Sequence, residues 1–202
     1  MKNLIYEYQY DPDHCDLFVE LFQEAKEKGL TMPGLCGQHN SDCKVETSVK
    51  KSTDLYFSLL DKSDIDPVKY RVKDFSEYIF GVIDHYLKDT GLNNIIGEVE
   101  FKEPLQLHHY APGEGFYALH GDSATYKTST RVLVFILYLN DVEDGGTFFP
   151  WQDYKSKSKK GNMIVFPASY THPHRGVVSY DEDKYILTGW VFHSNNGQES
   201  ED

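Results

Sequence analysis

From residue 98 onward, the chain is a succession of short strand-like runs separated by glycine, proline, asparagine and aspartate. The runs cover residues 98–111, 116–121, 131–140, 147–150, 163–167, 175–179 and 184–193. Many short runs with turn residues between them are typical of antiparallel sheets that fold into a sandwich or a jelly roll. This texture predicts a mainly β fold with some helix, of the α+β kind.

Two helices are expected in the first half of the chain, after a short strand at residues 4–8. Asp11 and Pro12 provide a helix start, and apolar residues then recur at helical spacing as far as Gly29. A second helix is expected to begin at Asp66 and Pro67 and to end at Gly91, with one apolar face. Both helices should brace one outer face of the roll.

Between these helices, residues 30–52 are polar and without period, and residues 53–60 are expected to form a strand. The first segment is longer than a connecting loop needs to be, which predicts either a disordered insert or a lid.

The length of 202 residues requires no more than one domain. We therefore expect a single domain over residues 1–202: a supporting part over 1–97, a catalytic core over 98–194 and an acidic tail over 195–202.

Charge and cysteine content limit the possible binding partners of the protein and its expected cellular compartment. A formal charge of −12 would repel a phosphate backbone, so no nucleic acid partner is expected. Three cysteines suit reduced thiols better than a disulfide framework. No apolar run has the length of a signal peptide core or a membrane span, so a cytoplasmic protein without a membrane partner is expected.

The sharpest local motif is His120-Gly121-Asp122. Residues two apart on a strand point to the same face, so His120 and Asp122 can bind one ion together. His174 follows about fifty residues later, where an antiparallel roll can return it to this pair. Two imidazoles and one carboxylate leave open positions on a metal, which is the geometry of O₂-activating Fe(II) enzymes.

A cationic residue supports this prediction. Lys184 stands ten positions after His174, and it shares strand parity with Ile186, Thr188 and Trp190. A cosubstrate such as 2-oxoglutarate would chelate the iron and bury its far carboxylate, which requires a cation and hydroxyl donors. We name Tyr138 and Thr188 as donors beside Lys184.

The wider pattern joins these residues into a longer motif. Tyr110-x-Pro-Gly precedes Tyr117-x-x-His120-x-Asp122, Arg131 leads into the run from Leu137 to Thr147, and His174-x-Gly176 precedes Lys184 and Trp190. Residues from about Leu105 to Phe192 thereby resemble the prolyl 4-hydroxylase-like family of 2-oxoglutarate- and Fe(II)-dependent dioxygenases.

This resemblance implies a distorted double-stranded β-helix in which His120, Asp122 and His174 bind Fe(II). It also implies that Lys184 anchors 2-oxoglutarate with Tyr138 and Thr188, and Tyr110 is expected beside the chelating end. O₂ would be the oxidant, with ascorbate as a supporting reductant.

The residues at the positions of Tyr117, Arg131 and Trp190 face the substrate proline in enzymes of this family. Their presence favours a peptide or protein substrate that contains proline. The flanking sequence Thr171-His172-Pro173-His174-Arg175 departs from the animal enzymes, and His172, with the same parity as His174, is the alternative third ligand.

Other patterns carry weaker hypotheses. Cys36-x-x-His39-x-x-x-Cys43, completed by Asp42 or His14, has some of the ligands of a zinc site but not a recurring zinc spacing. His108 and His109 should point to opposite faces of a strand, so they cannot share a metal and are expected to be structural. Trp151 is expected to pack on the roll.

Two alternatives to a prolyl hydroxylase remain open. The same chemistry could act on a free amino acid or a small metabolite, which would need a closed pocket with an extra charged clamp. A non-catalytic jelly-roll protein that holds a metal or a ligand is the other, although such a protein has no need of a buried lysine after its ligand. The sequence carries no feature that sets an oligomeric state.

Overall fold

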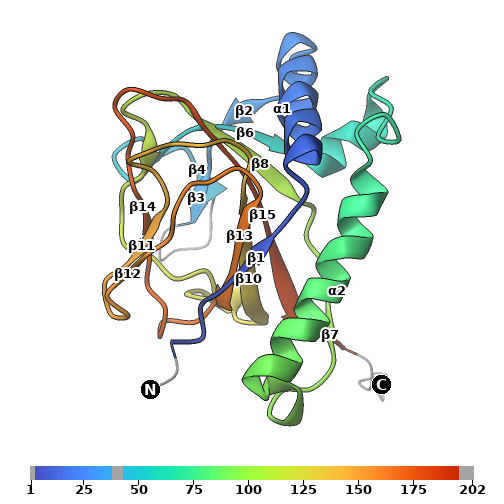
Figure 1. Cartoon of the computed structure of the whole chain (residues 1–202). Coiled ribbons are helices and arrows are strands. Elements are labelled where there is room, and N and C mark those ends of the chain that lie inside the picture. Colours follow the sequence, from blue (N-terminus) through green and yellow to red (C-terminus); the bar gives the residue numbers. More distant parts are fainter. Residues whose placement is uncertain (1–2, 38–42, 196–202) are drawn as a thin grey trace.

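The computed structural model describes residues 3–37 and 43–195 and shows two antiparallel sheets, with two helices on one side (Figure 1). The main sheet has the order β1 (Tyr6–Gln9), β13 (Asn162–Pro167), β10 (Arg131–Tyr138), β15 (Lys184–His193), β8 (Gln106–Tyr110), β6 (Thr53–Tyr56) and β2 (Met32–Pro33), and β7 (Val99–Glu100) pairs with the end of β15.

The second sheet is smaller and has the order β12 (Tyr154–Lys155), β11 (Thr147–Phe149) and β14 (Arg175–Gly176). Two further pairs join β5 (Lys50–Lys51) to β9 (Gly115–Phe116), and β3 (Cys36–Gly37) to β4 (Cys43–Lys44). The predicted mainly β roll is therefore confirmed.

Strand parity divides the main sheet into two faces. On β15, Leu187 and Val191 belong to a core shared with the helices, whereas Ile186 and Trp190 belong to a separate cluster on the inner face. Alternate side chains of β10 divide in the same way. Lys184 therefore lies on the inner face, as its parity with Ile186 and Trp190 predicts.

The helices α1 (Pro12–Glu27) and α2 (Val72–Thr90) cover the outer face of this sheet (Figure 1). Asp11 caps α1, because its side chain accepts a hydrogen bond from the Asp13 amide. The buried faces carry Phe18, Leu21, Phe22 and Ala25 on α1, and Phe75, Ile79, Val82, Ile83 and Tyr86 on α2. Fully burying one such apolar side chain contributes about 1.5–3 kcal/mol, so these faces fix the helices on the sheet.

Two expected boundaries are wrong. The second helix starts at Val72 rather than at Asp66, because Arg71 adopts a left-handed conformation (φ 51°) and Val68 is exposed. The strand expected over residues 53–60 ends at Tyr56, where a 3₁₀ helix, η1 (Phe57–Lys62), follows. Phe57 and Leu60, three residues apart, both enter the core, which a straight strand would not allow.

The segment 30–52 is more ordered than an unstructured insert, within the part that the structure describes. It contributes β2 to the main sheet and β5 to the pair with β9. Its lid role stays a prediction. Strands β1, β2 and β6, all from the first 97 residues, belong to the main sheet.

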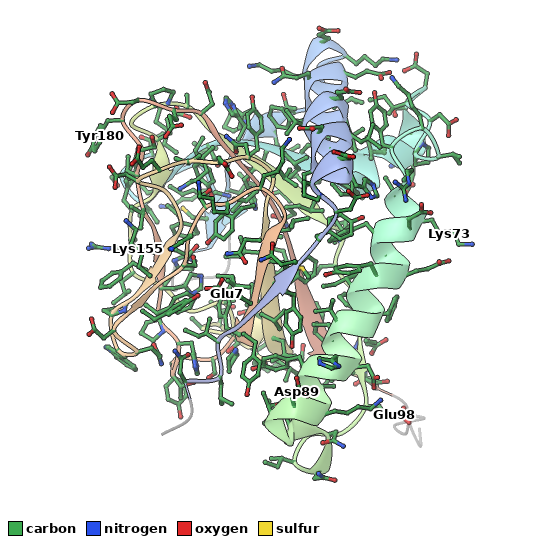
Figure 2. The ribbon with its side chains drawn as sticks, in the orientation of Figure 1. Glu7, Lys73, Asp89, Glu98, Lys155 and Tyr180 are labelled. Atoms are coloured by element: carbon green, nitrogen blue, oxygen red, sulfur yellow. The ribbon has the colours of Figure 1, made fainter. Side chains whose placement is uncertain are left out.

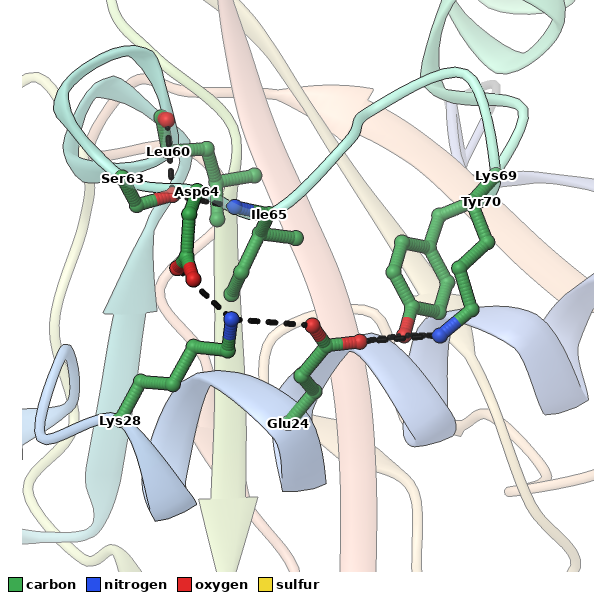
Figure 3. Close-up of polar contacts among 8 residues, drawn as sticks. All are labelled: Glu24, Lys28, Leu60, Ser63, Asp64, Ile65, Lys69 and Tyr70. Carbon is green, nitrogen blue, oxygen red and sulfur yellow. Dashed lines mark hydrogen bonds and ion pairs between the residues drawn. The ribbon is translucent and has the colours of Figure 1, made fainter.

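A polar network holds α1 against the segment between η1 and α2 (Figure 3). Glu24 accepts hydrogen bonds from Tyr70 and from Lys69 Nζ (2.9 Å), and Lys28 pairs with Asp64 at 2.7 Å. The Tyr70 hydroxyl and the Lys69 ammonium lower the pKa of Glu24 to about 2. Such surface pairs contribute little stability each, so their effect here is to orient the segment that leads into α2.

The outer surface is polar, and Lys73 and Lys155 project into solvent on opposite sides of the molecule (Figure 2). Within residues 3–37 and 43–195, no helix combines the length and the apolar composition of a membrane span.

Candidate active site

His120, Asp122 and His174 converge at one end of the roll. One ligand atom from each side chain lies within 4.8 Å of the others. The backbone brings the two histidines together: the His120 amide donates to the His174 carbonyl at 3.0 Å, and the His174 amide donates back at 2.9 Å. These two reciprocal hydrogen bonds hold His120 and His174 side by side, although the two residues are far apart in the sequence.

Both imidazoles are oriented by the backbone. His120 Nδ1 lies 3.1 Å from the Ala118 carbonyl, and His174 Nδ1 lies 3.1 Å from the His172 carbonyl. A carbonyl only accepts hydrogen bonds, so each Nδ1 carries the proton and each Nε2 is left free to bind a metal. Burial and the neighbouring His174 lower the pKa of His120 to about 4, which keeps this ring neutral at pH 7.

The two oxygens of Asp122 differ. Oδ1 accepts a hydrogen bond from the Trp190 indole at 2.8 Å. Oδ2 is buried, has no hydrogen-bond partner among residues 3–37 and 43–195, and lies 3.4 Å from His174 Nε2. Burial alone would raise the pKa of Asp122, but His174, His120 and the indole hydrogen bond outweigh it and lower the pKa. An ionised, unpartnered oxygen beside two imidazole nitrogens fits a divalent cation, and two nitrogens with one carboxylate suit Fe(II).

The alternative prediction, that His172 is the third ligand, is wrong. Its Nε2 bonds to the Asn3 carbonyl at 2.9 Å, and its Nδ1 bonds to the Thr171 hydroxyl at 2.9 Å. The parity argument fails because residues 171–173 form a bend, and β14 begins only at Arg175. His172 instead ties the start of the chain to this loop.

Beside the three ligands lies a cavity of about 280 Å³ between the two sheets. Lys184 lines it, is 3% exposed and lies 5.0 Å from the ring centre of Tyr110. Its ammonium donates to the Val177 carbonyl at 2.6 Å. Burial lowers the pKa of Lys184 to about 8, as expected for an ammonium that has no charged partner in the part of the chain that the structure describes.

The predicted hydroxyl donors also line this cavity. Tyr138 bonds through its hydroxyl to Thr147 (2.8 Å) and to Ser156 (2.6 Å), and Thr188 donates to the Phe135 carbonyl at 2.8 Å. Thr147 also lines the cavity, although it was not among the donors predicted from the sequence. It follows the glycine pair before β11, a signal that the motif contained.

Of the three residues predicted to contact the substrate, two line the cavity and one does not. Arg131 and Trp190 line the cavity, and the guanidinium of Arg131 lies 4.1 Å from the Trp190 ring centre and pairs with Glu103. Tyr117 is not among the lining residues, and its hydroxyl donates to the Gly113 carbonyl at 2.9 Å.

His108 and His109 point to opposite faces, as predicted. His109 faces outward, stacks on Tyr185 at 4.5 Å and pairs with Asp183 at 2.6 Å. His108 lines the cavity together with Lys50, a residue in the segment taken for a polar insert. The parity of His108 with Tyr110 on one strand was the signal for this placement.

The structure also bears on two minor hypotheses, the zinc site around Cys36 and the packing of Trp151. The prediction of His14 as a zinc ligand is wrong, because His14 lies on the buried face of α1 and bonds to Tyr10 and to the Tyr70 carbonyl. Cys36 is a buried free thiol, while His39 and Asp42 lie outside the described residues. Trp151 is 67% exposed rather than packed.

Comparison with known proteins agrees with this geometry. Residues 105–192 match the 2OG-Fe(II) oxygenase superfamily. This segment is a 2OG-Fe(II) oxygenase domain. Its matched region contains all three predicted ligands and Lys184. An Acanthamoeba polyphaga mimivirus protein named "Putative prolyl 4-hydroxylase" is 30% identical over 107 residues, which span 44% of this chain and 44% of that protein.

Solved structures show the fold of the oxygenase domain and of the segments around it. A Pseudomonas putida prolyl-4-hydroxylase has a TM-score of 0.63 at 16% identity, covering 94% of this chain and 92% of its own. The viral collagen prolyl hydroxylase of Paramecium Bursaria Chlorella virus-1 has a TM-score of 0.60 at 20% identity, covering 95% and 97%. A Trichoplax adhaerens prolyl hydroxylase, solved with a hypoxia inducible factor peptide fragment, has a TM-score of 0.65 at 12% identity, covering 95% and 84%. The predicted double-stranded β-helix is confirmed.

Proposed function

We propose that this protein is a 2-oxoglutarate- and Fe(II)-dependent dioxygenase that hydroxylates a proline residue within a peptide or protein. The observation that carries the proposal is a buried, partnerless Asp122 oxygen between two oriented imidazoles, in a cavity that also holds the buried Lys184 ammonium. The Asp122 oxygen with the two imidazoles suits a metal ion, and the Lys184 ammonium suits a dianionic cosubstrate.

His120, Asp122 and His174 would hold Fe(II), and Lys184 would bind the far carboxylate of 2-oxoglutarate. Tyr138 and Thr188 would offer hydroxyls beside Lys184, with Tyr110 along the cosubstrate. When bound, iron and 2-oxoglutarate supply the oxidising chemistry, with O₂ as oxidant and succinate and CO₂ as coproducts. The protein residues orient both groups and keep water out of an apolar cavity.

Two features favour a peptide over a small charged metabolite. Arg131 is neutralised by Glu103, and Lys50 is neutralised by Asp54, so neither is an unpaired clamp for a charged substrate. The named relatives and structural neighbours are prolyl hydroxylases, one of them bound to a peptide fragment. The Arg131–Trp190 stack, which lines the cavity, would face a proline ring and its backbone.

The test is succinate formation from 2-oxoglutarate under air, with Fe(II) and ascorbate, in the presence and absence of a proline-rich peptide. We expect turnover that rises with peptide, together with a mass gain of one oxygen atom on the peptide. His174→Ala should abolish turnover, whereas the neighbouring His172→Ala should retain it. Turnover that ignores every peptide would contradict the prolyl substrate, and no turnover by iron-loaded protein would contradict the oxygenase.

A further inference from the structure

A second cluster of polar residues lies at the cavity wall that β5, β6 and β8 form. Asp54 is fully buried, and Lys50 and His108 are each 4% exposed. Lys50 Nζ donates to Asp54 Oδ2 at 2.7 Å, and Ser52 donates to Asp54 Oδ1 at 2.7 Å. His108 Nδ1 also lies 2.7 Å from Asp54 Oδ1. None of these residues is needed for the metal or for 2-oxoglutarate.

The contact with Asp54 fixes the tautomer of His108. Interactions with His108 and Lys50 outweigh burial and lower the pKa of Asp54, so its oxygens only accept hydrogen bonds. A nitrogen 2.7 Å from such an oxygen must carry a proton, because two lone pairs would repel. Lys50 Nζ, 3.3 Å from the same nitrogen, therefore cannot be donating to it.

His108 consequently presents an unprotonated Nε2. Burial and the charge of Lys50 lower the pKa of His108, which keeps the ring neutral. Within the described residues Nε2 has no hydrogen-bond partner, and it is not among the fully enclosed polar atoms without one, so it faces the cavity. Lys50 beside it has three N–H bonds, of which Asp54 takes one.

The wall lies close to the metal ligands. Lys50 lies 5.9 Å from the Phe116 ring centre, and Phe116 stacks on His120 at 3.6 Å. On β8, His108 is two residues before Tyr110, which pairs with Lys184, so both side chains point into the same cavity. Because Lys50 and Asp54 cancel and His108 is neutral, the wall offers an acceptor and a donor but no net charge.

We propose that His108 and Lys50 recognise a neutral peptide group of the substrate. His108 Nε2 would accept a hydrogen bond from the substrate N–H, and Lys50 Nζ would donate one to a substrate carbonyl. This inference rests on the proposed peptidyl substrate and adds a specificity determinant to it. A free carboxylate is disfavoured at this wall, since Asp54 already neutralises the only cation in the Lys50, Asp54 and His108 group.

The experiment uses a proline peptide that the enzyme hydroxylates and a series in which each backbone N–H near the proline is replaced in turn by an ester oxygen. For the native enzyme, one replacement should lower kcat/KM by about threefold to tenfold, the effect of one neutral hydrogen bond. His108→Leu should lose this discrimination at that position alone. His108→Gln, whose side-chain oxygen can accept in place of Nε2, should restore it.

Equal discrimination by the native enzyme and His108→Leu would overturn the inference while leaving prolyl hydroxylation in place. The absence of any effect of ester replacement on the native enzyme would overturn it in the same way. A parent peptide that is not hydroxylated at all would overturn the proposed function and this inference with it. Nitrogen NMR of the ring gives an independent readout, since a proton on Nε2 rather than on Nδ1 would contradict the tautomer whatever the activity.

Discussion

At the scale of single residues, the metal site depends on which oxygen of Asp122 is free. The Trp190 indole occupies Oδ1 and leaves Oδ2 for the metal. Trp190→Phe keeps a ring for Arg131 to stack on but removes this donor. We expect Mn(II) affinity to fall by about tenfold to a hundredfold, the usual effect of losing a group that orients a ligand. Anaerobic calorimetry measures it.

Trp151→Phe is the matched control, because it makes the same change at an exposed position. Equal Mn(II) affinity of the two variants would show that the indole hydrogen bond does not orient Asp122.

The second prediction at this scale concerns the charge of Lys184. Burial lowers its pKa to about 8, so the ammonium loses its proton as pH rises through that value. Binding of 2-oxoglutarate needs the protonated form, so the Kd should stay constant at lower pH and then rise by about tenfold per pH unit at higher pH. Titration of the anaerobic Mn(II) protein with 2-oxoglutarate measures this.

Lys184→Arg should bind 2-oxoglutarate with little dependence on pH, because a guanidinium stays charged over the whole range. A native Kd that is constant up to pH 10 would contradict the role given to this lysine.

At the scale of elements, the turn before β11 sets the cosubstrate end of the cavity. Gly146 has φ 101°, and an added Cβ would lie 2.1 Å from the Ser156 carbonyl oxygen. Ser156 in turn holds the Tyr138 hydroxyl. Gly146→Ala should therefore cost about 3 kcal/mol in free energy of unfolding, from a left-handed backbone plus a steric clash, and should weaken 2-oxoglutarate binding.

Gly91 offers the comparison, because it ends α2 with φ 77° and has no atom within 4 Å of an added Cβ. Gly91→Ala carries only the backbone cost, about 1–2 kcal/mol, and should leave 2-oxoglutarate binding intact. Urea denaturation measures both variants, and equal losses would show that the turn relaxes around the new methyl group.

The elements also show what local sequence can and cannot predict. The long strand β15 matched its expected bounds, because a mostly apolar run of ten residues rich in β-branched and aromatic side chains is a strong strand signal. The start of α2 was missed because Asp66 and Pro67 make a turn whose capping pattern looks like a helix start. The strands β2 and β5 were missed because they are two residues long and are set by their partners.

At the scale of the whole molecule, the site joins distant segments. The three proposed metal ligands and Lys184 followed from motif spacing within residues 105–192. Lys50 and Asp54 did not, because their burial depends on β5 and β6 being carried to the cavity by pairing with β9 and β8. A lysine and an aspartate in a polar segment are ordinary surface residues until tertiary structure buries them.

Because the proposed metal ligands come from two segments far apart in the sequence, residues 120–122 and residue 174, metal binding should stabilise the whole fold. Mn(II), a redox-inactive stand-in for Fe(II), at about a hundred times its Kd should add about 2.7 kcal/mol to the free energy of unfolding. For a chain of this length that corresponds to a rise in Tm of about 5–10 °C. Anaerobic thermal denaturation, followed by circular dichroism with and without Mn(II), measures the shift.

The neighbouring histidines separate the ligand from its competitor. His174→Ala should lose the shift, because it removes a proposed ligand. His172→Ala should lower the starting Tm but retain the shift, because it removes only the bonds to the Asn3 carbonyl and the Thr171 hydroxyl. The opposite result would make His172 the third ligand and would require the bend at residues 171–173 to rearrange when metal binds. Loss of the shift in both variants would mean that the bend itself must be intact before His174 can reach the metal.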